Sequence, residues 1–439
     1  MCKEINPTIN ALIKAMITTD QLNSNIRGLK PSATLQINED SNRLIRQGRD
    51  IIKLGLGQSP FPVPPPVVKA LQDNAHEKDY LPVRGLDQLR KTVATYYQKR
   101  DGIERSADDI LVGPGSKELL FNLQMACNGE LLIPAPSWVS YAPQAIIIGR
   151  KVTWLPTKAE NNWRIDPETL DQFCTYNPGR PRILILNYPS NPTGCSYDSE
   201  SLAALAAVTR KHGIIVVADE IYAETNYSGS HESMAAHYPE GTVISSGLSK
   251  WCGAGGWRLG VMVFPDSLRE LQNTMAVIAS ETFTSISAPT QYAACTAFTP
   301  SSELDEYLSA SRKVLQTIAS YMVNRLRDCD LEMQNPEGGF YILVSFEKWR
   351  EKLYHNGITT PDQLCQQLLN NAGVALLPGT DFGLPENQLY TRLAFVDFDG
   401  EKALNAITEK NTPNEELLKN YCPKLVIACD RIKQWLQAL

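Results

Sequence analysis

Continuous apolar runs alternate with amphipathic segments through the middle of the chain. Four short runs consist mainly of branched apolar side chains: residues 110–112, 131–133, 183–186 and 214–218. Such runs are typical of strands that are buried on both faces. A helix is predicted over about residues 199–211, and Gly213 would close its C-terminal end. Strand, helix and strand in this order form a right-handed parallel unit. The pattern therefore predicts an α/β fold with a mostly parallel central sheet between helices.

The last third of the chain has a different pattern. A long amphipathic helix is predicted from about Ser302, because apolar residues recur at helical spacing up to Leu326. Shorter apolar segments over residues 340–344 and 390–395 predict a second, smaller sheet, and the final helix would bury Leu425, Ile432, Trp435 and Leu436. Residues 400–423 between them are expected to be a polar connection.

These patterns divide the chain into an arm and two domains. Residues 1–30 are polar and weakly patterned, so we expect an N-terminal arm. The prolines at positions 60–66 mark the crossing between the domains, because proline cannot occupy a central strand. We expect a large domain over residues 67–311 and a smaller α+β domain built from residues 31–66 and 312–439.

Polar residues follow several of the predicted strands. Asn191 comes after the run at 183–186, Asp219 and Tyr222 after the run at 214–218, and Lys250 after a short apolar run at 243–244. Parallel sheets of this kind bind ligands beyond the carboxyl ends of their strands. The sequence therefore predicts that these four side chains meet in one crevice.

The segment around Lys250 carries its own chemical signal. A lysine that is held in place and partly desolvated can form a Schiff base with a carbonyl compound. Glycines at 253, 255 and 256 would let the backbone approach a ligand, and the planar charged fork of Arg258 suits a phosphate group. Lysine and arginine together fit a phosphorylated aldehyde. The alternative is a glycine-rich surface turn with two solvated cations.

A second anion site is predicted where a helix follows the strand at 110–112. A tight turn ends at Gly115, and the helix begins with Ser116 and Lys117. Unpaired amides and the positive end of the helix dipole attract anions, and the Ser116 hydroxyl adds a donor. A glycine turn before a helix is weak by itself, and the P-loop pattern GxxxxGK[ST] is absent.

Composition excludes several other classes. The chain has 439 residues, 43% of them hydrophobic, and a formal net charge of -6. No basic run suggests nucleic-acid binding, no apolar window is long enough to predict a membrane span, and no leader pattern opens the sequence, so a cytoplasmic enzyme is expected. Ten cysteines without a CxxC pair and five histidines without metal spacing predict neither disulfides nor a metal site.

Two motifs together carry a family resemblance. The segment SSGLSKWCGAGGWRLG at 245–260 resembles the lysine attachment segment of class I aminotransferases, and the string SNPTG at 190–194 is a strong signature of the same family. These are enzymes of the aspartate aminotransferase superfamily that use pyridoxal 5'-phosphate in fold type I. The resemblance implies ping-pong transfer of an amino group between an L-amino acid and a 2-oxo acid, with Lys250 forming the Schiff base. It also implies a homodimer with active sites at the interface.

The resemblance assigns roles to further residues. Asp219 would contact the pyridine nitrogen, Asn191 and Tyr222 the phenolic oxygen, and Trp138 would stack on the ring. The phosphate would be held by Gly115, Ser116, Lys117, Ser249 and Arg258, with Tyr80 donated by the other subunit. Arg392 would bind the substrate α-carboxylate, and the substrate site would also include Gly57, Trp138 and Asn191.

Three departures from the family pattern affect specificity and phosphate binding. No lysine or arginine occurs between Arg269 and Arg312, and Met125 stands where some members have a lysine that reads a second carboxylate. Aspartate specificity is therefore not predicted, although Arg84, Ser32 or Thr34 could compensate. Gly247 stands where many members have a phosphate-binding serine.

Two other functions share the motifs. Carbon–sulfur lyases and aminocyclopropane-carboxylate-type synthases use the same cofactor on the same fold, so they remain the alternative. A non-catalytic regulatory module that binds the cofactor is disfavoured, because the thirty residues before the body contain no basic helix-turn-helix pattern.

Overall fold

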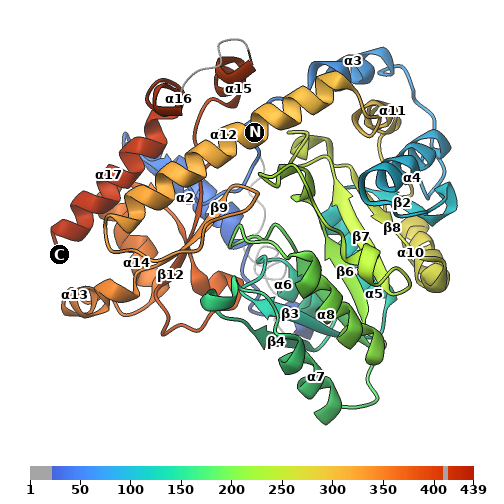
Figure 1. Cartoon of the computed structure of the whole chain (residues 1–439), viewed down its shortest axis with the longest axis horizontal. Helices are drawn as coiled ribbons and strands as arrows, with labels where there is room; N and C mark the ends of the chain where they lie inside the picture. Colours follow the sequence, from blue (N-terminus) through green and yellow to red (C-terminus); the bar gives the residue numbers. More distant parts are fainter. Residues whose placement is uncertain (1–21, 409–413) are drawn as a thin grey trace, which may run out of the picture.

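A seven-stranded sheet forms the centre of the computed structural model, which describes residues 22–408 and 414–439 (Figure 1). Its strand order is β2-β8-β7-β6-β5-β3-β4. The strands are β2 (Ile110–Gly113), β3 (Glu130–Ala135), β4 (Val152–Pro156), β5 (Arg182–Asn187), β6 (Ile215–Asp219), β7 (Thr242–Gly247) and β8 (Gly260–Val263). The pairings from β4 to β7 are all parallel, and β8 is antiparallel to both of its neighbours. The predicted mostly parallel sheet is confirmed.

Both faces of this sheet are buried, which explains the continuous apolar runs. Alternate residues of β5 point to opposite sides: Leu184 packs in one apolar cluster with Leu205 of α8, whereas Ile185 packs in another with Leu119 of α5. The helices around the sheet are α3 (Pro65–Asp73), α4 (Asp87–Asp101), α5 (Ser116–Ala126), α6 (Tyr141–Ile147), α7 (Pro167–Tyr176), α8 (Ser199–Lys211), α9 (Met234–His237), α10 (Arg269–Glu281) and α11 (Ala288–Ala297). Each strand end therefore emerges from a rigid, packed layer.

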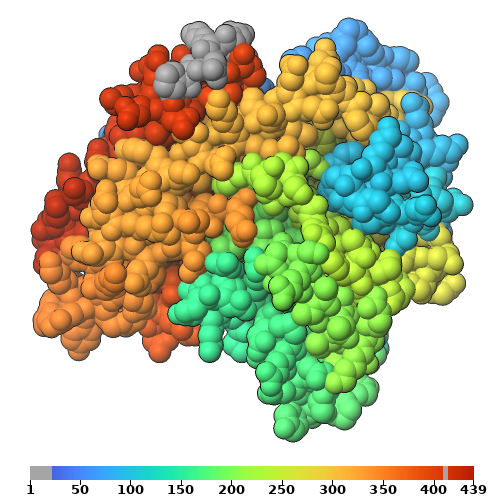
Figure 2. Space-filling model, viewed as in Figure 1, coloured from blue at the N-terminus to red at the C-terminus, as the bar shows by residue number. Residues whose placement is uncertain are grey.

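A second region of small sheets lies beside the first. Strands β9 (Tyr341–Ser345), β12 (Tyr390–Ala394) and β11 (Leu377–Pro378) form an antiparallel sheet, and β1 (Ile52–Lys53) pairs in parallel with β10 (Val374–Ala375). The helices here are α2 (Ala33–Arg46), α12 (Ser302–Arg327), α13 (Arg350–His355), α14 (Pro361–Gln367), α15 (Gly400–Thr408), α16 (Asn414–Tyr421) and α17 (Pro423–Gln437). Figure 2 shows the C-terminal part of this region, from α12 onward in orange and red, beside the green middle of the chain.

The long helix α12 organises the second region, as its amphipathic pattern predicted. Its Val314, Ile318 and Met322 are fully buried. They belong to the same apolar cluster as Ile342 and Val344 of β9. The proposed domain limits at 66 and 312 stay a prediction. Of the predicted arm, residues 1–21 lie outside the described residues, and Ser24–Ile26 form a short 3₁₀ helix.

The prediction of a polar connection over residues 400–423 is wrong. Residues 400–408 form α15 and residues 414–421 form α16, while 409–413 lie outside the described part. Leu404 and Leu417 are buried against the helical core. Each helix has a short apolar stripe on its packed face and Glu, Lys and Asn on its exposed face. The segment is therefore polar on average although one face of each helix is buried.

Two further findings concern the described residues alone. No helix among them is both long and apolar enough to cross a membrane. They also contain no group of three or more His, Cys, Asp or Glu side chains placed to hold a metal ion.

Candidate active site

A cavity of about 450 Å³ opens at the carboxyl ends of β5, β6 and β7. It brings together most of the residues singled out in the sequence: Gly57, Ser116, Lys117, Trp138, Asn191, Asp219, Tyr222, Ser249, Lys250, Arg258 and Arg392. Two predicted residues lie elsewhere. Gly115 forms the turn under Arg258, and Tyr80 is 92% exposed on the surface. Segments from both regions of the fold therefore meet in this cavity.

Asp219 ends β6 and is buried at the floor of the cavity. The Tyr141 hydroxyl donates to its Oδ2 at 2.5 Å, and the Asn187 amide donates to its backbone oxygen at 2.9 Å. Its Oδ1 is buried and has no hydrogen-bond partner among the residues that the structure describes. Burial raises the pKa of Asp219 to about 6, although the Tyr141 hydrogen bond opposes the rise. A buried carboxylate oxygen without a donor is costly, so this atom is suited to a ligand that brings an N–H or O–H group.

Lys250 follows β7 and points into the same cavity. Its Nζ donates to the Gly57 carbonyl at 2.7 Å and lies 5.6 Å from the ring centres of Tyr222 and Phe340. Burial and, to a smaller extent, the nearby Arg392 guanidinium lower the pKa of Lys250 to about 8, although Asp219 opposes the change. A substantial fraction of this amine is therefore neutral near pH 8, which is the form that attacks a carbonyl carbon.

An anion cup lies at the N-terminus of α5. Gly115 caps this helix with a positive φ of 94°, and Arg258 itself has a left-handed φ of 56°. The Arg258 guanidinium is held by the carbonyls of Gly255 at 2.9 Å and Pro114 at 3.2 Å. A Cβ on Gly115 would lie 2.4 Å from Arg258 Nη2, so glycine is required for this close approach. Free amides, Ser116 and the guanidinium together suit a phosphate group.

The unusual Gly247 has a packing explanation. Gly247 on β7 lies opposite Gly260 on β8. A Cβ on Gly247 would lie 2.5 Å from the Leu259 carbonyl oxygen, and one on Gly260 would lie 2.3 Å from the Ser116 amide nitrogen. The two strands are thus pressed against the anion cup, and a serine at 247 would force the backbone apart.

Arg392 is completely buried, unlike a surface arginine on a strand. It lies between the rings of Tyr341 and Phe382, with centre distances of 4.8 and 5.1 Å. Its Nη1 donates to Asn191 Oδ1 at 3.2 Å, and Nη2 donates to the Gly55 carbonyl. Its Nε is buried and has no partner within residues 22–408 and 414–439. Burial lowers the pKa of Arg392, so an anionic ligand would offset the cost of a charge held in this position.

Sequence reasoning missed two tyrosines that shape the site. The Tyr341 hydroxyl hydrogen-bonds the Tyr222 hydroxyl at 2.7 Å, and Tyr141 holds Asp219. A Cβ on Gly57 would lie 2.0 Å from the Tyr341 hydroxyl, so this glycine makes room for the tyrosine. The signal in the sequence is weak: Tyr141 is the last residue of the segment PSWVSY, and Tyr341 is the last residue of the segment PEGGFY.

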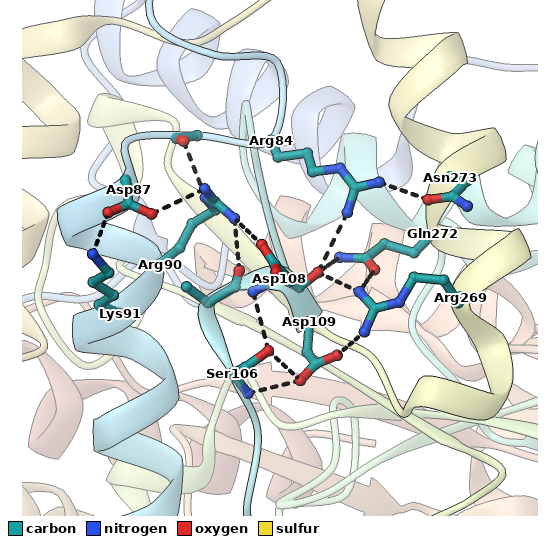
Figure 3. Close-up of polar contacts among 12 residues, drawn as sticks. Arg84, Asp87, Arg90, Lys91, Ser106, Asp108, Asp109, Arg269, Gln272 and Asn273 are labelled. Carbon is teal, nitrogen blue, oxygen red and sulfur yellow. Dashed lines mark hydrogen bonds and ion pairs between the residues drawn. The ribbon is translucent and has the colours of Figure 1, made fainter.

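The residues considered for specificity fall in different places. Thr34 lines the cavity, and the Ser32 hydroxyl lies 3.0 Å from the Thr34 hydroxyl. Arg84 donates to Asn273 Oδ1 at 2.6 Å and to the Asp108 carbonyl, and it does not line the cavity (Figure 3). Met125 is 42% exposed on α5 and does not line the cavity either.

A mostly parallel sheet with a buried lysine, a buried carboxylate and an anion cup at its strand ends defines an enzyme of the fold type I class. A family model for class I and II aminotransferases matches residues 49–406. The chain therefore belongs to the class I and II aminotransferases, which are pyridoxal-phosphate-dependent enzymes.

Individual relatives agree with this assignment. An aspartate aminotransferase of Geobacillus stearothermophilus is 33% identical over 378 residues, which cover 84% of this chain and 93% of that protein. One from Bacillus subtilis is 32% identical with the same coverage. The solved structure of a Thermus thermophilus aspartate aminotransferase with maleate is similar with a TM-score of 0.80 and 28% identity, covering 94% of this chain and 99% of that one.

The amine of Lys250 should titrate far below an ordinary lysine. In cofactor-free protein, trace labelling with an acylating reagent should follow a midpoint near pH 8, because burial disfavours the charged amine. Peptide mass mapping at a series of pH values measures it, and the same peptide in denaturant is the control and should titrate near 10.5. A midpoint above 10 in the folded protein would contradict the cavity's effect on the amine.

Proposed function

We propose that this chain binds pyridoxal 5'-phosphate in the cavity and transfers an amino group from an acidic L-amino acid to a 2-oxo acid. The observation that carries the proposal is the pair formed by Lys250 and Asp219. One cavity holds a buried amine with a depressed pKa and a buried carboxylate oxygen that lacks a donor. An aldehyde that also carries a protonated ring nitrogen satisfies both groups.

The residues present fit this cofactor. Lys250 Nζ would hold its aldehyde carbon, the free Oδ1 of Asp219 its ring nitrogen, and Tyr222 with Asn191 its phenolic oxygen. The phosphate would lie on the amides of Ser116 and Lys117, next to the Gly115 turn whose own N–H donates to the Gly113 carbonyl at 2.7 Å. Ser249 and Arg258 would lie beside it, and Trp138 would cover the ring. When bound, the cofactor supplies an electron sink for charge that develops at the substrate α-carbon.

The side chains of this chain orient the substrate and move its proton. Arg392 has an unpartnered Nε within a fixed fork, so it can hold an α-carboxylate in one orientation. Lys250, once free as a neutral amine, is the base that takes the proton from the α-carbon and returns it on the other side of the transfer. The Gly57 carbonyl accepts a hydrogen bond from Nζ and so aims the amine.

The charge balance of the cavity favours an acidic substrate. Besides Lys250, its wall carries three cations, Lys117, Arg258 and Arg392, against the single carboxylate of Asp219. A phosphate and one carboxylate occupy Arg258 and Arg392, which leaves the Lys117 ammonium for a second carboxylate. Burial lowers the pKa of Lys117, and a second anion would offset that cost. The Thr34 hydroxyl lies on the same wall, and the Thermus thermophilus relative was solved with maleate, a dicarboxylate.

The reaction outcome separates a transaminase from a lyase. Cofactor-loaded protein mixed with L-aspartate and no 2-oxo acid should release one 2-oxo acid per subunit and no ammonia, because the amino group stays on the cofactor. Quantifying oxo acid and ammonia over time measures this. If aspartate released no 2-oxo acid while an S-substituted L-cysteine continuously released a thiol, ammonia and pyruvate, the carbon–sulfur lyase would replace the transaminase.

Lys117 tests the substrate assignment in the same assay. Lys117→Met should lower kcat/KM for aspartate by roughly 10- to 100-fold, the loss expected when a charge-assisted hydrogen bond is removed. The rate with L-alanine, which has no second carboxylate, should change much less and serves as the control. Equal losses for both donors would contradict a distal-carboxylate role.

We also propose that the active enzyme is a homodimer in which Tyr80 reaches the partner's phosphate. Tyr80 is 92% exposed and does not line the cavity of its own subunit. The loop after it is fixed by polar contacts: Arg84 donates to Asn273 Oδ1 on α10, and Arg90 of α4 donates to the Gly85 carbonyl (Figure 3). An exposed tyrosine on an anchored loop is suited to insertion into a neighbouring molecule.

Mixed dimers test this arrangement. Tyr80→Phe and Lys250→Ala should each be poorly active or inactive alone. A mixed dimer places an intact Tyr80 against the one intact Lys250, so up to one site per dimer should recover wild-type activity. Co-expression with two affinity tags isolates the mixed species. No recovery, or recovery without dimer formation, would contradict the shared site.

A further inference from the structure

A cluster of buried charges lies directly behind the cavity, on the turn that follows β6. Glu220 comes after Asp219, and its side chain is completely buried. Arg100 of α4 places Nη2 2.5 Å from Glu220 Oε2 and Nη1 3.2 Å from Glu224 Oε1. One guanidinium therefore binds the glutamates on both sides of Tyr222.

The turn is tied to a second helix as well. Arg312 of α12 donates through Nε to the backbone oxygen of Glu224 at 2.7 Å and pairs with its Oε2 at 3.1 Å. The Tyr96 hydroxyl of α4 donates to the same carboxylate. Residues 220–224 are thus anchored at both ends, and the segment between carries Tyr222 while Asp219 immediately precedes it.

Glu220 has partners on its other side. The Ser233 hydroxyl donates to Oε1, and His231 Nε2 lies 3.3 Å from Oε2 with its ring stacked 5.1 Å from Tyr188. Burial alone would raise the pKa of Glu220, but His231 and Arg100 lower it to about 2. Glu220 is therefore negatively charged at neutral pH beside the catalytic carboxylate.

This charge acts on Asp219. Burial is the largest cause of the raised pKa of Asp219, and Glu220 adds to the rise, while Lys250 opposes it. The cluster contains the carboxylates of Asp101, Glu220 and Glu224 against two guanidiniums. The titratable groups that face Arg100 are Tyr96, Tyr97, Asp101, Glu220 and Glu224, and those that face Asp219 are Tyr141, Glu220, Tyr222 and Lys250.

We propose that Arg100 is a positioning residue of the aminotransferase: it clamps Glu220 and Glu224 so that Asp219 and Tyr222 are held toward the cavity, and it offsets the charge of Glu220. This inference rests on the proposed binding of pyridoxal phosphate. The two effects are separable, because the clamp needs a forked donor and the charge balance needs only a cation.

Two variants should shift the pH midpoint of the bound cofactor's visible absorbance in opposite directions. Arg100→Met removes a positive charge, so the pH midpoint of the bound cofactor's visible absorbance should rise by about one unit, the order expected for one buried charge at an effective dielectric near 20. Glu220→Gln is close to isosteric and removes a negative charge, so the midpoint should fall by a similar amount. Spectrophotometric titration measures both, and Arg100→Met should also weaken cofactor binding by roughly tenfold or more.

Arg100→Lys separates positioning from charge. It keeps the cation but cannot bind both glutamates as a fork does, so the midpoint should stay near that of the unaltered protein while kcat falls. The double variant Arg100→Met with Glu220→Gln removes one charge of each sign and should return the midpoint toward its original value, even where Arg100→Met alone folds poorly. Arg325→Met removes a guanidinium that pairs with Asp430 at 2.6 Å on the other side of the fold, and it should leave the midpoint and kcat unchanged.

Midpoints that shift in the same direction, or not at all, in Arg100→Met and Glu220→Gln would overturn the charge effect. An unchanged kcat in Arg100→Lys would overturn the clamp. A failure of the unaltered protein to take up pyridoxal phosphate would instead overturn the proposed function, so the two failures are distinguishable.

Discussion

The structure depends on holding unpaired charge away from water. Lys250, Asp219 and Arg392 are buried around one cavity. Among the described residues, Asp219 Oδ1 and Arg392 Nε have no hydrogen-bond partner, and burial shifts the pKa values of Asp219 and Lys250 toward their neutral forms. Such groups cost folding free energy unless a ligand completes them. The surrounding sheet supplies that energy, because both of its faces are packed and its strand ends are rigid. The cavity is thus preorganised for a ligand that carries an aldehyde, a ring nitrogen and anionic groups.

Close backbone approaches make this arrangement possible. Gly247 and Gly260 let β7 and β8 press against the start of α5, and Gly57 lets Tyr341 approach the chain that carries the Lys250 acceptor. At Gly247 and Gly260 a single methyl group would collide with backbone, and at Gly57 it would displace the Tyr341 hydroxyl. Glycine therefore acts here by its absent side chain, and its flexibility matters chiefly at Gly115, where φ is positive.

Much of the site could be predicted because it lies at the ends of apolar runs. Asn191, Asp219 and Lys250 each follow a continuous buried strand, and parallel strands bring their ends together. Tyr141, Tyr341 and Arg100 could not be found this way, because their roles depend on contacts between elements distant in sequence. Helices α15 and α16 were missed for a related reason. Each has only a short apolar stripe, and that stripe is buried by packing in the same apolar cluster as α12 and α17.

Covalent trapping locates the lysine that reacts with pyridoxal phosphate. The protein is mixed with pyridoxal phosphate, reduced with sodium borohydride, digested and mapped by mass spectrometry. The account predicts one phosphopyridoxyl group per chain, on Lys250, and its loss in Lys250→Ala without redistribution to other lysines. Label spread over exposed lysines, or none on Lys250, would contradict it.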